Sequence, residues 1–292
     1  MSTTGSTKRP SPAPVYEKRN DRGHWQVRVV PNMFAAVETG MPTVIPEAAS
    51  SPAESQRVAV ATGAHEVIIE CPTHVDRLSV LSADEFHSIL EAYAARLTHW
   101  RNHGQLRYGL VFKNQGPRAG ASIAHLHSQL IALPFIPAEV EAEQRRAAES
   151  YSRDRFCPYC QLIAKEQAAN ERIVLVREGF VVFCPFASWQ PGEVWLMPMA
   201  HEPSFESMSP DRLERLTGVL HPLVSRLESI IPGAAYNLLL RTAPWVAGCD
   251  AWSHWRIELL PRVNALAGLE LATGIHINHL PPERAAGQLR QH

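Results

Sequence analysis

The sequence predicts an α+β fold that is a tandem duplication of one unit, with antiparallel sheets and packed helices. Three observations carry this prediction. Strand-like and helix-like stretches alternate along the chain, two segments share one order of landmark residues, and the composition is that of a globular protein. At 292 residues the chain is long enough for two domains or for one duplicated domain.

The duplication is visible in residues 65–86 and 192–213, which share Glu-Val, then a proline, a histidine and a serine-led helix start. In both copies a helix, a strand and a histidine-bearing strand follow at nearly the same interval. Chance rarely reproduces order and spacing together. We therefore expect a flexible arm at 1–23, a first unit at 24–150 and a second unit at 151–292.

The first unit opens with strand-like stretches at 25–37 and 65–74, in which apolar and β-branched residues dominate. Residues 82–103 predict a helix, because Ser82 can cap it and apolar residues recur about every 3.6 positions. Strands are expected again in two later stretches, 105–116 and 121–133.

The glycine-rich loop at 113–122 can bring backbone N–H groups close to an anion. Residues 137–156 predict a helix that leads into a cysteine pair. The second unit repeats the pattern of the first, with a helix at 209–230 followed by strands at 235–244 and 254–262.

The overall charge excludes several classes of partner. A formal net charge of -1 provides no basic field for nucleic acid or anionic lipid, so phosphate recognition must be local. No apolar stretch approaches the ~20 residues of a membrane span, and residues 1–20 lack the apolar core of a signal peptide. We expect a cytoplasmic protein without nucleic-acid or membrane partners.

The five cysteines are unevenly spaced and form a poor disulfide framework, so free thiols are expected. Cys157 and Cys160 have the spacing of a metal-binding pair, although redox chemistry is the alternative for the pair alone. His201 and His254 lie at matched positions of the second unit. Together the four residues predict a Cys2His2 site, whose donors suit a structural zinc ion.

The first unit has corresponding histidines, His74 and His125, but no cysteine pair precedes them. Loss of the metal is the favoured interpretation, with substitute ligands or simple hydrogen bonding as alternatives. His127 corresponds to Arg256 in the second unit. Because arginine cannot act as a nucleophile or lose its proton at neutral pH, histidine chemistry is expected in the first unit alone.

His127 is the candidate nucleophile. A histidine whose other ring nitrogen is held by a backbone carbonyl presents a free nitrogen that can attack phosphorus and form a phosphoramidate. Gln129 follows two residues later on the same strand face and can donate to a phosphoryl oxygen, as can amides around Gly116, Gly120 and Ser122. The sequence contains no P-loop or GxGxxG pattern, so nucleotide binding of those kinds is not expected.

From about Trp25 to the carboxyl end the sequence resembles the galactose-1-phosphate uridylyltransferase branch of the histidine-triad superfamily. The stretches that carry the resemblance are 25–37, 65–74, 112–134, 157–160 ("CPYC"), 185–205, 254–262 and 267–286 ("AGLELATGIHINHLPPERAA"). The resemblance implies two histidine-triad-like units, usually in a homodimer. It also implies a galactose-metabolism activity, in which a nucleotidyl-histidine passes a nucleotide between an NDP-sugar such as UDP-glucose and a hexose 1-phosphate. The family's amino-terminal cysteine pair has no counterpart here.

The resemblance also implies roles for individual residues. The family's His-Pro-His-x-Gln motif falls on 125–129, with His127 as nucleophile, Gln129 as phosphate contact and Leu126 in place of proline. The remaining implied contacts are Asn32 and Phe34 for the nucleobase and ribose, Asn114, Gly120 and Ser122 for the phosphates, and Glu270 for the sugar hydroxyls. Leu269 stands where an aromatic residue usually precedes the glutamate.

Two alternative functions are compatible with the sequence. A phosphorylase or hydrolase would use the same His127 intermediate but pass the nucleotide to phosphate or to water. A catalytically weakened, zinc-stabilised nucleotide-binding protein is the other alternative. Against it, His127, Gln129 and the glycine loop are all intact.

Overall fold

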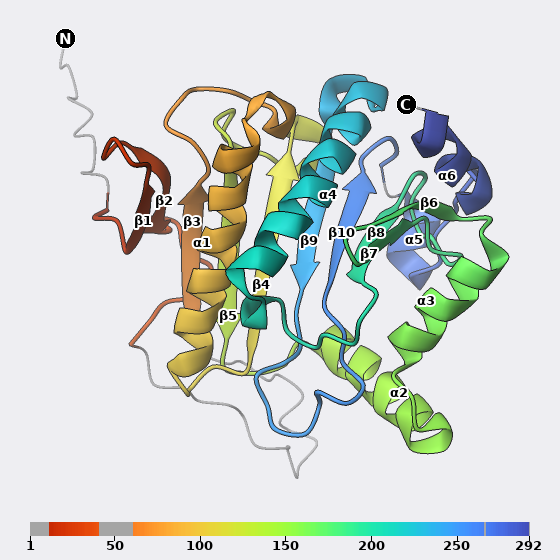
Figure 1. Ribbon diagram of the computed structural model, residues 1–292. Helices are drawn as coiled ribbons and strands as arrows, with labels where there is room; N and C mark the ends of the chain where they lie inside the picture. Colours follow the sequence, from red (N-terminus) through yellow and green to blue (C-terminus); the bar gives the residue numbers. More distant parts are fainter. Residues whose placement is uncertain (1–11, 41–60, 266, 292) are drawn as a thin grey trace.

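The computed structural model describes residues 12–40, 61–265 and 267–291 of the chain. Within them a single ten-stranded sheet forms the centre of the molecule (Figure 1). Its strands are β1 (Tyr16–Arg19), β2 (Trp25–Pro31), β3 (Ala64–Ile69), β4 (Tyr108–Gln115), β5 (His127–Leu133), β6 (Ile173–Arg177), β7 (Phe180–Phe183), β8 (Val194–Pro198), β9 (Tyr236–Arg241) and β10 (Arg256–Pro261).

The sheet has the order β1-β2-β3-β5-β4-β9-β10-β8-β7-β6, and all of its strand pairs are antiparallel. Counted outward from the central pair, the first half runs β4, β5, β3, β2, β1 and the second half runs β9, β10, β8, β7, β6. The two halves therefore have one topology, and the predicted antiparallel α+β duplication is confirmed. Because β4 pairs with β9, the halves share a continuous sheet.

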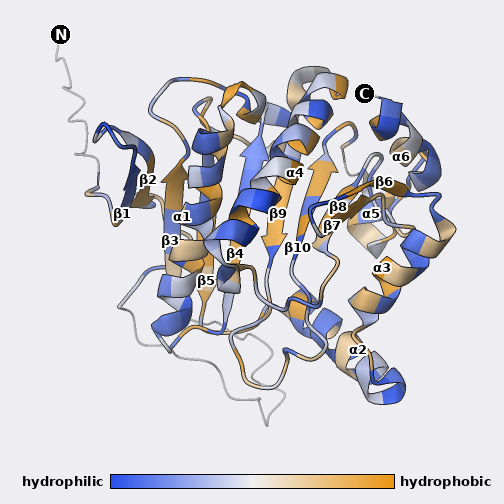
Figure 2. Ribbon diagram, viewed as in Figure 1, coloured by the Kyte–Doolittle hydropathy of each residue, from blue (hydrophilic) through white to orange (hydrophobic). Residues whose placement is uncertain are grey.

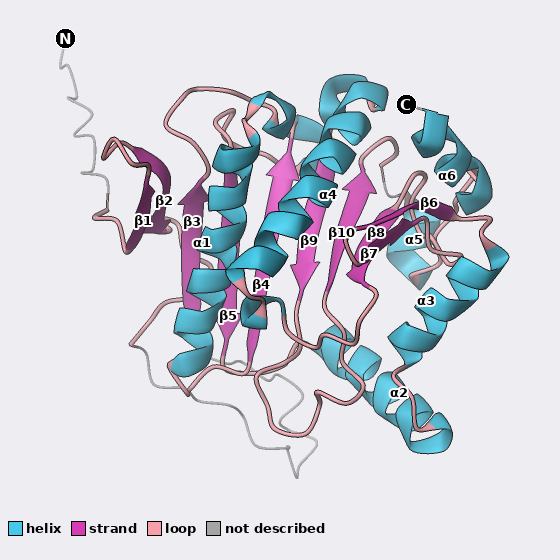
Figure 3. Cartoon of the chain, viewed as in Figure 1, coloured by secondary structure: helices cyan, strands magenta, loops and turns pink. Residues whose placement is uncertain are grey.

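Six α-helices accompany the sheet in the described residues (Figure 3). They are α1 (Ala83–Asn102), α2 (Ala138–Asp154), α3 (Pro158–Ala169), α4 (Pro210–Ile230), α5 (Gly268–Thr273) and α6 (Pro282–Gln291). The repeat-related helices α1 and α4 pack against each other across one face of the sheet (Figure 1). None of the described helices has the length and apolar character needed to cross a bilayer.

The amino end of α1 is capped as the sequence predicts. Ser82 Oγ accepts a hydrogen bond from the Glu85 backbone N–H at 3.3 Å, and the Glu85 carboxylate accepts one from the Ser82 N–H at 2.8 Å. This reciprocal pair satisfies two N–H groups that a helix start leaves without partners.

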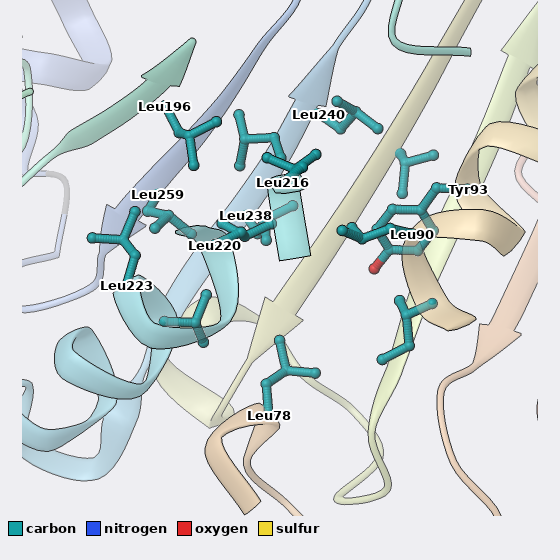
Figure 4. Close-up of a cluster of buried hydrophobic side chains, with 14 of the residues drawn as sticks. Leu78, Leu90, Tyr93, Leu196, Leu216, Leu220, Leu223, Leu238, Leu240 and Leu259 are labelled. Carbon is teal, nitrogen blue, oxygen red and sulfur yellow. The ribbon is translucent and has the colours of Figure 1, made fainter. Parts of the chain in front are cut away.

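The core lies between the α1–α4 layer and the sheet. Leu216 and Leu220 of α4 pack over Leu238 and Leu240 of β9, and all four side chains are buried (Figure 4). Burial of each such side chain contributes roughly 1.5–3 kcal/mol. In Figure 2, hydrophilic and hydrophobic residues alternate along α1 and α4, which is the pattern expected of amphipathic helices.

Several predicted boundaries are wrong. The stretch 121–133 was predicted as one strand, but β5 begins only at His127, so His125 lies in the preceding loop. β2 likewise ends at Pro31, short of the predicted stretch 25–37. α2 ends at Asp154 because Arg155 adopts a left-handed conformation (φ 60°), and the predicted boundary at 150 therefore falls inside this helix.

The predicted arm is wrong in part. Residues 1–11 lie outside the described residues, but Tyr16–Arg19 form β1 and pair with β2. The polar composition of this segment concealed an edge strand, a position at which charged side chains are common. Two second-unit strands also went unpredicted because they are short and lack clear alternation: Ile173–Arg177 at the other edge of the sheet, and its neighbour Phe180–Phe183.

Candidate active site

His127 is held with one ring nitrogen free. It is the first residue of β5, and its Nδ1–H donates to the backbone carbonyl of His125 at 2.8 Å. Because a carbonyl can only accept, the proton is on Nδ1 and Nε2 keeps its lone pair. His127 is 9% exposed and lines a cleft of about 410 Å³. His125 thus contributes its backbone to the site rather than a side chain on the same strand face.

The glycine-rich loop forms one wall of this cleft. Asn114, Gly116 and Ser122 line it, whereas Gly120 turns the loop with φ 88°. A neighbour fixes the Asn114 amide, because the Nδ2 of Asn237 donates to its Oδ1 at 2.8 Å. The Nδ2 hydrogens of Asn114 therefore remain available to a ligand.

A buried ionic network supports β5 on the face opposite His127. The Lys113 ammonium lies 2.6 Å from Glu70 Oε2 and 3.1 Å from the backbone oxygen of His127. The hydroxyls of Tyr93 and Ser128 also hydrogen-bond to Glu70, and all four side chains are buried. Removing one member of such a pair costs about 3–5 kcal/mol, so the network fixes the strand that carries the nucleophile. Sequence reasoning missed it, because the partners come from segments that are far apart in the sequence.

Gln129 lies on the open face of the sheet beside a residue that sequence reasoning overlooked. Its Oε1 is 2.8 Å from His65 Nε2 on β3. Asn32 also reaches His65, with Nδ2 at 3.0 Å from the same nitrogen. β3 pairs with β5, and Val67 lies directly opposite Gln129. His65 is two residues from Val67, so its side chain lies on the same face as Gln129. Once this pairing is known, strand alternation indicates His65.

The predicted nucleobase residues flank a second cleft of about 550 Å³, which Asn32 and His65 help to line. The Oδ1 of Asn32 accepts a hydrogen bond from the Phe34 N–H at 2.9 Å, which shapes the turn after β2. Phe34 itself is 84% exposed, so its ring is available for contact with a ligand or another chain.

Glu270 is not brought to His127 within this chain. It lies on α5, where its Oε2 accepts from the Ala267 N–H at 3.0 Å. Hydrogen bonds from backbone N–H groups hold the pKa of Glu270 below its usual range. It lines a separate cleft with Trp189 and His276, and that cleft shares no residue with the one at His127. Its role at a sugar therefore stays a prediction.

The four predicted metal ligands do converge. The donor atoms of Cys157, Cys160, His201 and His254 all lie within 4.8 Å of one another. Cys160 Sγ is 3.5 Å from the Nδ1 of His201 and 3.7 Å from that of His254. Sulfur and nitrogen on a tetrahedral zinc ion are separated by about 3.6 Å, given the usual bond lengths.

Backbone carbonyls orient both imidazoles of this cluster. His201 Nε2 lies 2.9 Å from the Asp250 oxygen, and His254 Nε2 lies 2.9 Å from the Pro198 oxygen. Each Nε2 therefore carries the proton, and each Nδ1 lone pair faces the thiols. Burial lowers the pKa of His254 to about 4, which keeps its ring neutral.

The Cys160 thiol does not have the lowered pKa of a reactive redox cysteine. Burial, together with the neighbouring Cys157, raises the pKa of Cys160 to about 12, whereas reactive thiols have lowered pKa values. A zinc ion would deprotonate both thiols on binding. The donor set and its geometry therefore fit a structural zinc ion.

The first unit retains half of this arrangement. The Nδ1 atoms of His74 and His125 lie 3.4 Å apart, and His125 Nε2 is 2.9 Å from the backbone oxygen of Cys71. In the described part of the chain, the second-unit cluster is the only group of three or more such donors. The pair in the first unit thus lacks the thiols that complete its counterpart.

Arg256 occupies the second-unit position equivalent to His127. Its guanidinium is buried, with Nε 2.7 Å from Glu258 and Nη1 2.7 Å from Glu143. It also stacks on Trp195, with 4.6 Å between the guanidinium carbon and the ring centroid. An ion-paired arginine therefore fills the place where the first unit has its free imidazole.

Comparison with known sequences shows similarity along nearly the whole chain. A family model described as "Domain of unknown function (DUF4921)" matches residues 20–291. An ADP-glucose phosphorylase of Arabidopsis thaliana is 30% identical over 272 residues, which cover 92% of this chain and 75% of that protein. A galactose-1-phosphate uridylyltransferase of Thermotoga maritima is 26% identical over 237 residues, which cover 78% of this chain and 74% of that protein.

The fold is similar to that of a solved structure over nearly the whole chain. A crystal structure of an ADP-glucose phosphorylase from Arabidopsis thaliana with bound ADP-glucose matches with a TM-score of 0.82 at 27% identity. The match covers 97% of this chain and 86% of the other.

Proposed function

The chain belongs to the DUF4921 family, within the galactose-1-phosphate uridylyltransferase-like nucleotidyltransferases, and we propose that it transfers a nucleoside monophosphate from an NDP-sugar by way of His127. One observation carries the proposal. The hydrogen bond from Nδ1 to the His125 carbonyl leaves Nε2 as a free nucleophile at the cleft, beside a loop able to donate N–H groups to phosphate.

The proposed reaction has two displacements at one phosphorus. Nε2 of His127 attacks the phosphorus on the nucleoside side of the NDP-sugar, an N–P bond forms, and the P–O bond to the sugar phosphate breaks. Sugar 1-phosphate leaves. An acceptor oxygen then attacks the same phosphorus and the histidine departs. The product depends on the acceptor: a hexose 1-phosphate gives a new NDP-sugar, inorganic phosphate gives an NDP, and water gives an NMP.

The acceptor defines two candidate activities. Exchange between UDP-glucose and a hexose 1-phosphate is the activity that the uridylyltransferase relatives support. The similarity to an ADP-glucose phosphorylase supports a second, in which ADP-glucose is the donor and inorganic phosphate the acceptor. Both use the same intermediate on His127.

Steady-state kinetics test the proposal. With UDP-glucose or ADP-glucose as donor and galactose 1-phosphate or inorganic phosphate as acceptor, initial rates of the productive pair should give parallel double-reciprocal lines. The reason is that sugar 1-phosphate leaves before the acceptor binds. Intersecting lines would mean direct transfer between two bound substrates and would contradict a covalent intermediate.

Gln129→Ala should lower kcat by on the order of 10²-fold with little change in fold, because the site loses one donor to the charge that develops on phosphorus. Gln105→Ala, on the exposed turn after α1, is the matched control, and its kcat should equal that of the unaltered protein. A Gln129→Ala enzyme within twofold of the unaltered rate would exclude glutamine from this role.

We further propose that zinc occupies the cluster of Cys157, Cys160, His201 and His254. Four protein ligands leave no open position on the ion, so the metal would supply folding free energy rather than a reacting group. The homodimer and the sugar contact at Glu270 remain predictions from family resemblance.

A further inference from the structure

His65 is surrounded by groups whose hydrogen-bonding direction is fixed. The backbone N–H of Ala36 points at its Nδ1, at 3.0 Å. The backbone N–H of Phe34 points at Oδ1 of Asn32, at 2.9 Å. A backbone N–H can only donate, so both of these side-chain atoms must accept.

The ring state of His65 follows from these donors. With Nδ1 accepting, a neutral imidazole carries its proton on Nε2. The Nε2–H then donates to Gln129 Oε1 at 2.8 Å. The Asn32 amide nitrogen, 3.0 Å from the same Nε2, cannot donate to a protonated nitrogen, so its hydrogens remain for a ligand.

This contact decides which end of the Gln129 amide meets substrate. Gln129 extends from β5 on the same face as His127, and a flipped amide would turn its oxygen toward the phosphoryl oxygens. With Oε1 bonded to His65, the NH2 group is the end left free. Such a preorganised donor needs no rearrangement as charge develops.

We propose that His65 is a positioning residue: its Nε2–H fixes the Gln129 amide with NH2 toward the transferred phosphoryl group, a role that rests on the proposed function. A second hydrogen bond, from the Ala36 backbone N–H to Nδ1 of His65, ties this orientation to the loop predicted to hold the nucleobase. His65, which lines the second cleft, therefore contacts the strand that carries His127 through Gln129.

Two variants separate the ring nitrogens. In His65→Gln the side-chain nitrogen can stand near the position of Nε2 and donate to Gln129, whereas His65→Asn reaches only the position of Nδ1. We expect His65→Asn to lower kcat by about 10- to 100-fold, no more than the loss of the donor itself, and His65→Gln to recover most of that loss. The KM for the NDP-sugar should change less than kcat.

A double variant tests whether His65 acts through Gln129. Once Gln129→Ala is present, adding His65→Asn should change kcat by less than about twofold, because the group that it orients is gone. Equal losses in His65→Gln and His65→Asn, or full additivity in the double variant, would overturn the positioning role and indicate a general effect on structure.

The ring state can be measured without any activity. In ¹⁵N-labelled protein, long-range ¹H–¹⁵N correlation, with His65→Asn used for assignment, should show His65 protonated at Nε2 and unprotonated at Nδ1. Protonation at Nδ1 would overturn the inference whatever the enzyme does. If the protein formed no nucleotidyl adduct with ADP-glucose or UDP-glucose, the proposed function would fail, and this spectrum would still decide the His65–Gln129 contact.

Discussion

His127→Asn should abolish nucleotidyl transfer, with a loss on the order of 10⁶-fold, the scale seen when an enzyme loses its covalent nucleophile. Asparagine can keep the hydrogen bond to the His125 carbonyl through its amide N–H, but it has no lone pair equivalent to Nε2. The variant should therefore fold normally, retain its metal and still bind NDP-sugar. Progress curves with each donor, followed at high enzyme concentration, measure the residual rate.

The matched control for this variant is His24→Asn, which changes an exposed histidine on the turn between β1 and β2. It should have the unaltered rate. Activity of His127→Asn within tenfold of the unaltered enzyme would exclude His127 as nucleophile.

Loss of the metal should have the largest effect on stability. We expect about one zinc per chain, and Cys157→Ser or a strong chelator should remove it. Closed zinc sites contribute several kcal/mol to folding, and a loss of about 4 kcal/mol would lower Tm by roughly 7 °C in a chain of this size. Elemental analysis and calorimetry on the same samples measure both quantities.

Cys249→Ser is the control for the zinc site. Cys249 is a buried thiol outside the cluster, and it donates to the Pro244 carbonyl at 3.3 Å, a bond that serine can also make. Its metal content should be unchanged. Two zinc ions per chain, or none in a folded sample, would contradict the assignment, and two would point to His74 and His125.

The features that the sequence predicted depend on order and local spacing. The duplication follows from landmarks repeated in one order, and the strand order of the sheet carries the same repeat. The zinc ligands could be chosen because a cysteine pair precedes only one of the two histidine pairs. The hydrogen bond between His127 and His125 spans two residues, so a sequence pattern could suggest it.

The features that were missed depend on which strands become neighbours. Lys113 meets Glu70 because β4 and β3 flank β5, and His65 meets Gln129 because β3 pairs with β5. Neither partner is near the other in sequence, and alternation along one strand does not reveal what faces it. The short edge strand β1 was missed for a related reason, since its charged residues indicate exposure more strongly than pairing.

The most direct test of the central claim is mass spectrometry of the protein after brief incubation with ADP-glucose and UDP-glucose in separate samples, without acceptor. The account predicts a mass increase of one nucleoside monophosphate with at least one donor, located on the peptide that contains His127 and absent from His127→Asn. The added mass would also identify the base. Turnover without any adduct, or an adduct on another residue, would contradict the account.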